Sequence, residues 1–190
     1  MKIDQRFPKL DPPGFLERAF FWLDSGIDIG IFYAALELRF AFEKILIKHG
    51  FASTNYSKSF ENLKWQPAKL RENLSKEFSH LVDLDLAYEF SLGTIENAVP
   101  IGYYIPVDQD LFSMYGRLDN YLHAQWAIPI GAPDNAWQRE HSQKLRDFAE
   151  RLIPHANPIN TLDLLSIPNI NVEKSEIGDT EAILRKYWKQ

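Results

Sequence analysis

The chain has 190 residues, of which 45% are hydrophobic and 25% charged, and its formal charge at pH 7 is −5. This length suits one globular domain with a small additional segment. The negative net charge argues against a basic protein that coats nucleic acid. The absence of cysteine excludes disulfides, thiolate zinc sites and cysteine nucleophiles, and the lack of any long apolar run favours a cytoplasmic protein without a membrane segment.

Two helices are expected near the start of the chain. The first is predicted over about 13–24, because proline is tolerated in a first turn and a Ser-Gly pair follows the apolar pattern. The second is predicted over about 28–49, with apolar residues on nearly every face, so it should be central or lie at a subunit interface. Within it, the i,i+4 spacing of Arg39 and Glu43 predicts a structural ion pair.

The middle of the chain has a looser pattern. A helix is predicted over about 67–80, where leucine and phenylalanine recur every four residues. Short strands or extended segments are predicted at 89–92 and 103–107. Pro100 and Pro106 cannot donate to a sheet ladder, so we expect only edge strands around them.

Three helical patterns follow. One begins near residue 108 and is expected to carry the segment 114–126. A long amphipathic helix is predicted over about 134–153, ended by Pro154 and Pro158. A last helix is predicted after residue 179, in a tail that packs on the rest of the chain or on a second subunit.

The segment 114–126 carries the strongest candidate chemistry. Arg117 stays protonated and can hold a phosphate in its planar fork. On a helix, Asp119 lies one turn before His123, where it can orient the imidazole, raise its pKa and leave it able to transfer a proton. The arginine–histidine spacing is weak by itself, and an Asp119–His123 pair that ties this helix to its neighbour is an equally open interpretation.

Other kinds of site find little support in the sequence. There is no glycine-rich phosphate loop and no His-Glu-x-x-His motif, and the five histidines are scattered over the predicted elements. We therefore expect neither a metal site nor a cofactor.

Four pieces of the chain occur in the order found in the HEPN superfamily of small helical-bundle proteins. Residues 15–26 resemble the first helix of the family with its glycine-marked turn, and 34–46 resemble the second helix with its Arg-x3-Glu. The stretch from Arg117 to His123 resembles the family's Arg-x4–6-His motif, and 134–153 resemble the following helix. The resemblance covers about residues 13–153.

This resemblance implies a mainly α fold, an antiparallel helical bundle that forms a homodimer, with a few short extended or β segments. We expect the HEPN-like bundle at 1–154, with an insertion at about 50–107. Residues 155–190 would form a C-terminal appendage packed on the bundle or on a second subunit.

In catalytic members of this family, paired Arg and His side chains from two subunits form a metal-independent ribonuclease site. The resemblance assigns the phosphate-holding role to Arg117 and proton transfer to His123. The family usually has a polar residue directly after the arginine, where this chain has Leu118, and Asn120 is the candidate for the polar role.

Two functions are therefore open. The first is a non-catalytic, dimeric interaction module in a prokaryotic stress or defence setting, which binds an antitoxin or other partner protein, or an RNA or nucleotide-like ligand. The second is a metal-independent RNA endonuclease of the toxin or abortive-infection type, with Arg117, Asn120 and His123 as its catalytic residues. The acidic composition and Leu118 favour the first. Burial of His123 within its own subunit would count strongly against the second.

Overall fold

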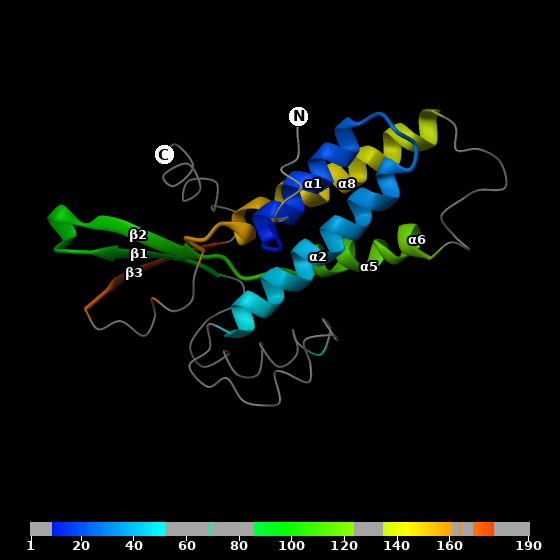
Figure 1. Cartoon of the computed structure of the whole chain (residues 1–190). Coiled ribbons are helices and arrows are strands. Elements are labelled where there is room, and N and C mark those ends of the chain that lie inside the picture. Colours follow the sequence, from blue (N-terminus) through cyan, green and yellow to red (C-terminus); the bar gives the residue numbers. More distant parts are fainter. Residues whose placement is uncertain are drawn as a thin grey trace. The chain divides into compact units, whose positions relative to one another are not determined.

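The computed structural model describes residues 9–51, 69, 86–123, 135–160, 164 and 169–176. They are mainly helical and include a small three-stranded antiparallel sheet (Figure 1). The chain divides into two compact units, and each is made from two separate segments. The helical unit comprises Met1–Lys44 and Gln109–Ala156, and the sheet unit comprises Ile45–Asp108 and Asn157–Gln190.

Several predictions fall outside what the structure can test. The helices predicted over 67–80 and after residue 179 lie outside the described residues, apart from Lys69. The predicted domain boundary at residue 154 stays a prediction. Within the described part of the chain, no helix is both long enough and apolar enough to span a membrane.

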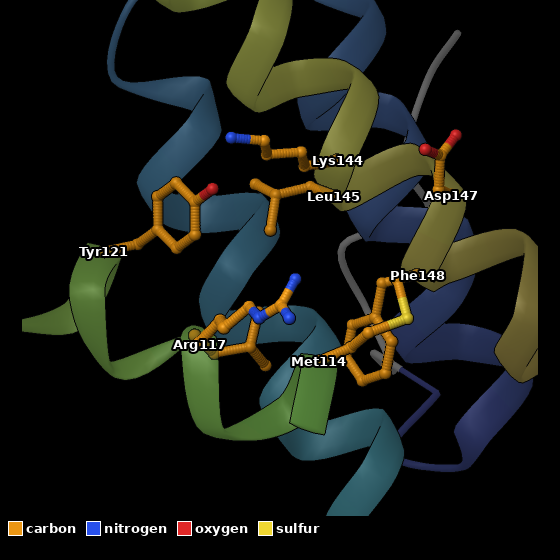
Figure 2. A pocket seen from close by; sticks show the side chains of 8 residues that line it. Met114, Arg117, Tyr121, Lys144, Leu145, Asp147 and Phe148 are labelled. Carbon is orange, nitrogen blue, oxygen red and sulfur yellow. The ribbon is translucent and has the colours of Figure 1, made fainter. Parts of the chain in front are cut away.

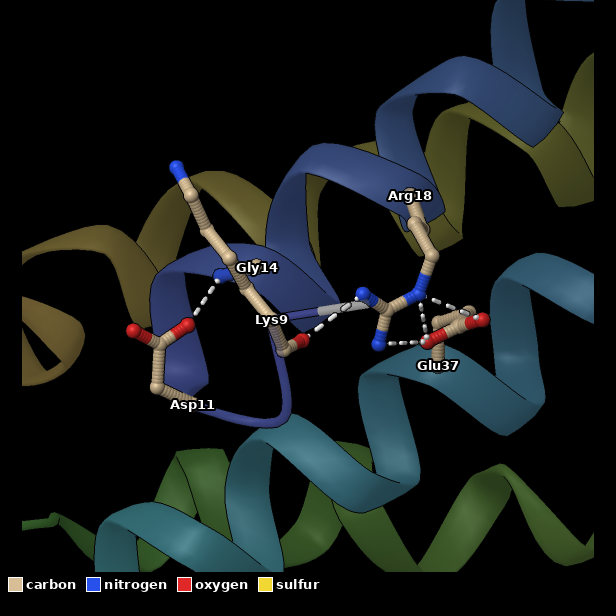
Figure 3. Close-up of polar contacts among 5 residues, drawn as sticks. All are labelled: Lys9, Asp11, Gly14, Arg18 and Glu37. Atoms are coloured by element: carbon tan, nitrogen blue, oxygen red, sulfur yellow. Dashed lines mark hydrogen bonds and ion pairs between the residues drawn. The ribbon is translucent and has the colours of Figure 1, made fainter. Parts of the chain in front are cut away.

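Helix α1 (Pro12–Asp24) begins and ends as its local sequence predicts. The Asp11 carboxylate caps it by accepting a hydrogen bond from the backbone N–H of Gly14, at 2.9 Å (Figure 3). The prolines in the first turn cost no helical hydrogen bond, because first-turn N–H groups have no helical acceptor. After the helix, Gly26 adopts a positive φ of 65°, which a glycine tolerates at little cost.

Helix α2 (Gly30–Phe51) confirms the second predicted helix. Its residues 30–44 belong to the helical unit and 45–51 to the sheet unit. Within the helical unit its buried face alternates small and large side chains, which lets neighbouring helices approach closely. These buried residues are Ile31, Ala34, Ala35, Leu38, Ala41 and Phe42.

A half-buried ion pair joins α1 to α2. The Arg18 Nε donates to both carboxylate oxygens of Glu37 at 3.0 Å, and Arg18 Nη1 donates to the Lys9 carbonyl at 2.8 Å (Figure 3). The guanidinium also lies over the Phe15 ring, 4.7 Å from its centroid. Both charged side chains are less than one-fifth exposed, so water and salt screen this pair less than an ordinary surface pair.

Further helices of the helical unit are α5 (Gln109–Arg117), α6 (Asp119–Leu122) and α8 (Asn135–Ala156). The fully buried Phe42 of α2 joins α5 and α8 at one point. Its ring stacks on Tyr115 at 4.6 Å between centroids, and it also contacts the rings of Phe112 at 5.0 Å and Phe148 at 6.0 Å. Helix α8 also packs along α1.

Helix α8 continues past Pro154, so the predicted end of this helix at residue 153 is wrong. A proline inside a helix removes its own N–H and crowds the preceding turn. Here only half a turn follows it, and that half-turn buries His155 and Ala156. Burial of these two residues offsets the lost hydrogen bond.

The sheet unit holds strands β1 (Leu86–Leu92), β2 (Val99–Tyr104) and β3 (Asn171–Glu176), in the order β2-β1-β3. A tight connection through η1 (Ile95–Asn97) joins the first two strands, and Gly93 enters it with a φ of 111°. The strand predicted at 89–92 is confirmed within β1. The prediction at 103–107 is met only at Tyr103 and Tyr104, because β2 runs from Val99 to Tyr104 and residues 105–107 lie outside it. Pro100 lies on an edge strand, as predicted, whereas β3 was not predicted.

The segment after α8 anchors the sheet unit. Asn160 is fully buried, and its Oδ1 accepts a hydrogen bond from the backbone N–H of Ile105 at 3.0 Å. The Lys48 ammonium, near the end of α2, donates to the carbonyl oxygens of Asn157 and Asn160, each at 3.0 Å. Segments far apart in sequence are thus joined by side chains that form hydrogen bonds with backbone groups.

Candidate functional site

The segment with the predicted site residues is divided between two short helices rather than carried on one. Helix α5 ends at Arg117 and α6 begins at Asp119, so the helix expected to carry this segment is interrupted at Leu118. Leu118 lies between them and is buried at 2% exposure. Its buried apolar side chain therefore fixes the turn between α5 and α6. At this position the family pattern that the segment resembles has a polar residue. The part of the segment from Ala124 to Trp126 lies outside the described residues.

The three predicted site residues are all exposed. Arg117 ends α5, Asn120 lies within α6, and His123 follows α6 as its C-terminal cap. The backbone of His123 is already extended, with φ −96° and ψ 108°, so its side chain has left the helical face. Since His123 is not buried within its own subunit, its placement does not remove the catalytic alternative.

The expected pairing of Asp119 with the His123 imidazole is not found among the described residues. Instead, an oxygen of the Asp119 carboxylate accepts a hydrogen bond from Nη1 of Arg39 at 3.0 Å. The physical reason is twofold: His123 has left the helix, and a permanently charged guanidinium on α2 is a stronger partner. What links Asp119 to His123 is a backbone hydrogen bond, from the His123 N–H to the Asp119 carbonyl at 3.0 Å.

Arg39 confirms the predicted structural pair with Glu43. Its Nε donates to Glu43 Oε1 at 3.0 Å, and the Tyr115 hydroxyl donates to the same carboxylate oxygen at 2.9 Å. Burial, together with the adjacent Glu43 carboxylate, raises the pKa of Tyr115, which therefore stays protonated. This network holds α2, α5 and α6 together and is a structural feature of the site.

A pocket of about 180 Å³ lies beside Arg117, between α5, α6 and α8 (Figure 2). Its apolar lining comes from Met114, Leu118, Leu145 and Phe148. Its polar lining comes from Arg117, Tyr121, Lys144 and Asp147. The predicted site residues Asn120 and His123 do not line it, so the structure separates Arg117 from its expected partners.

A second histidine, which the sequence did not single out, lies at the edge of this pocket. His141 Nδ1 is 2.7 Å from the hydroxyl of the pocket residue Tyr121, and its ring packs on Trp137 at 4.3 Å between centroids. Burial and the nearby Lys144 lower the pKa of His141, although Glu140 opposes them. Burial and Glu140 raise the pKa of Tyr121 to about 12. At neutral pH both groups are therefore uncharged, and the hydroxyl can donate to the imidazole.

Only one of the two His141 contacts could have been predicted from the sequence. Trp137 and His141 are one turn apart, so their contact on α8 follows from helical spacing. The partner hydroxyl of Tyr121 lies 20 residues away, and nothing in the local pattern predicts that contact.

An exposed apolar stripe lies along one face of α2 and is made of Tyr33, Leu36 and Phe40, together with Ile29, which directly precedes the helix. Their spacing of four, three and four residues places them in one line, as in a coiled-coil seam. Their exposed fractions are 51%, 43%, 37% and 39%. Single exposed apolar residues are ordinary, but a continuous line of them marks an interaction surface. The prediction that α2 is surrounded by protein therefore fails on this face, and the subunit-interface alternative stays a prediction.

Metal chemistry gains no support from the described residues, among which no group of three or more His, Cys, Asp or Glu side chains could hold an ion. No protein-family model, curated protein or solved structure matches the chain.

Proposed function

We propose that the chain is an HEPN-like helical protein that acts as a dimeric interaction module in a prokaryotic stress or defence setting. The observation that carries this proposal is the exposed stripe on α2. The order of α1, α2, the Arg117–His123 segment and α8 supports an HEPN-like bundle, because helices form where the resemblance expects them. A further partner would be an antitoxin or another protein.

A second copy of the chain is the occupant that best fits the stripe. Asp28 and Lys44 are both exposed, and each lies eight residues from Leu36, on opposite sides of it. In an antiparallel pairing centred on Leu36, Asp28, which precedes α2 and accepts a hydrogen bond from Gln138, would therefore lie near the Lys44 end of the other copy. Such an arrangement is two-fold symmetric, buries the same apolar line on both copies and pairs opposite charges at both ends.

The solution mass tests this proposal. We expect sedimentation equilibrium to give twice the 22.1 kDa chain mass for the wild type at micromolar concentration. Leu36→Glu should weaken self-association at least about tenfold, because it places a charge at the centre of the interface. Val99→Glu, a change at an exposed apolar residue of the sheet unit, is the matched control and should leave the mass unchanged. A monomeric wild type, or a dimer that Leu36→Glu leaves intact, would overturn the proposal.

A second candidate function is metal-independent RNA cleavage, which the exposure of Arg117, Asn120 and His123 favours. An exposed guanidinium could hold the scissile phosphate, and an exposed imidazole could transfer a proton. The test is cleavage of single-stranded RNA in the presence of EDTA. His123→Ala and Arg117→Ala should each reduce the rate at least about a hundredfold, whereas Arg139→Ala, at an exposed arginine of α8, should not. Inactive wild-type protein, or wild-type activity in both site variants, would overturn this candidate.

A further inference from the structure

We propose that the pocket between α5, α6 and α8 binds a small organic anion, consisting of one phosphate or carboxylate group attached to a flat apolar body. This proposal goes beyond self-association through α2 and does not depend on it. The pocket combines a cation that has no ionic partner among the described residues, a second available cation and an apolar wall in one space of about 180 Å³.

Arg117 is the first of these cations. Its guanidinium forms no hydrogen bond or ion pair with any residue that the structure describes. The one acid of the pocket lining, Asp147, points away from it and accepts a hydrogen bond from Gln143 at 2.7 Å (Figure 2). An arginine fork matches the paired oxygens of a carboxylate or phosphate, so Arg117 is placed to receive such a group.

Lys144 is the second cation. It pairs with Glu140, one turn earlier on α8, at 2.6 Å, but both side chains are more than half exposed. Water and salt screen an exposed i,i+4 pair of this kind, so a bound anion can compete for the ammonium. The neighbouring Tyr121 hydroxyl stays neutral and does not repel an anion.

The rest of the lining fits an apolar body. Leu118, Leu145 and Phe148 are buried and therefore fixed in place, whereas Met114 is only half-buried and can adapt to a ligand. The volume corresponds to about six water molecules and lies below the roughly 300 Å³ of pockets for drug-sized ligands. A single ring with its anionic group fits this space.

Calorimetric titration with three probes tests the proposal: phenyl phosphate, inorganic phosphate and benzyl alcohol. Phenyl phosphate should bind most tightly, because it alone uses both the cations and the apolar wall. Arg117→Gln should weaken its binding about tenfold or more, and Lys144→Gln should weaken it less. Arg139→Gln removes an exposed arginine of α8 that does not line the pocket, and should change nothing.

Met114→Ala separates the two halves of the pocket. It should weaken phenyl phosphate binding and leave inorganic phosphate binding unchanged, since it shortens only the apolar wall. Failure of the wild type to bind phenyl phosphate at millimolar concentration would overturn the proposal, as would equal binding by wild type and Arg117→Gln. Repeating the titration with Leu36→Glu distinguishes the two proposals, because pocket binding should survive even if self-association is lost.

Discussion

The contacts that join elements within the helical unit differ in kind from those within the sheet unit. In the helical unit, side chains join the elements: aromatic rings around Phe42, the Arg18–Glu37 pair, and Arg39 with its two carboxylates. In the sheet unit, backbone groups do most of this work, through the β1 pairings and the carbonyls that Lys48 contacts. The candidate chemistry lies in the helical unit, where charged side chains already reach between elements and can be shared with a ligand.

The largest expected effect comes from removing a fully buried ring from each unit. Phe42→Ala and Phe90→Ala each delete a fully buried ring, and each should lower the free energy of unfolding by about 3–5 kcal/mol. Urea denaturation measures the loss. Phe40→Ala removes a ring that is 39% exposed, and should cost clearly less than Phe42→Ala.

Hydrogen exchange on the same two variants examines the comparison directly. Phe42→Ala should reduce protection of α8 amides and spare the β1–β2 amides, and Phe90→Ala should do the reverse. If both variants lost protection equally across both units, the units would unfold as one, and the distinction between them would have no energetic meaning.

The next effect comes from the ion pair between α1 and α2. Arg18→Ala leaves a half-buried Glu37 carboxylate without its hydrogen bonds, which should cost about 2 kcal/mol in urea denaturation. Glu17→Ala breaks an exposed pair with Lys9 and should stay within about 0.5 kcal/mol. Equal losses in the two variants would mean that the burial of the Arg18 pair has no consequence.

A smaller effect is expected at the start of α1. Asp11→Ala removes the oxygen that caps the Gly14 N–H, and should cost about 1 kcal/mol. Asp11→Asn keeps an acceptor at this position and should retain most of the stability. If both variants were equally destabilised, the carboxylate charge, and not the hydrogen bond, would be the stabilising feature.

These contacts also show how much of the fold the sequence could predict. Helices α1, α2 and α8 were predictable because caps, prolines and apolar spacing are local. Strand β3 was not, because most of its residues are polar and exposed and it pairs through its backbone with β1, which lies 80 to 90 residues earlier in the chain. Its alternation carries no apolar signal.

The candidate site was predictable only as a position. Arg117 was singled out and does line a pocket, but the pocket's other cation, Lys144, comes from α8. The partner of Asp119 proved to be Arg39, which is 80 residues away and cannot be inferred from local spacing. Contacts between distant segments are decided by packing, and for this reason the sequence motif suggested the wrong neighbours.

The smallest effect is a pH dependence at the edge of the pocket. Burial and Lys144 lower the pKa of His141 in the folded protein, while Glu140 opposes them and the Tyr121 hydroxyl contacts Nδ1. The unfolded chain, with an ordinary histidine pKa of about 6.5, then binds more protons than the folded one as the pH falls. The contribution of His141 to the free energy of unfolding is therefore fully present above about pH 6.5. It is lost as the pH falls from there through the lowered pKa. The urea midpoint should therefore decrease more between pH 7.5 and pH 5 for the wild type than for His141→Gln.

The exposed His123 offers a matched control for this measurement, since His123→Gln also removes one imidazole from the helical unit. It should keep the pH dependence of the wild type, because the side chain of His123 makes no contact of this kind among the described residues. A His141→Gln variant that lost stability at acid pH as steeply as wild type would show that the Tyr121–His141 contact does not respond to protonation. The Tyr121–His141 contact would then stay the same between pH 7.5 and pH 5. Any pH dependence of anion binding in this range would have to come from the ligand rather than from this contact.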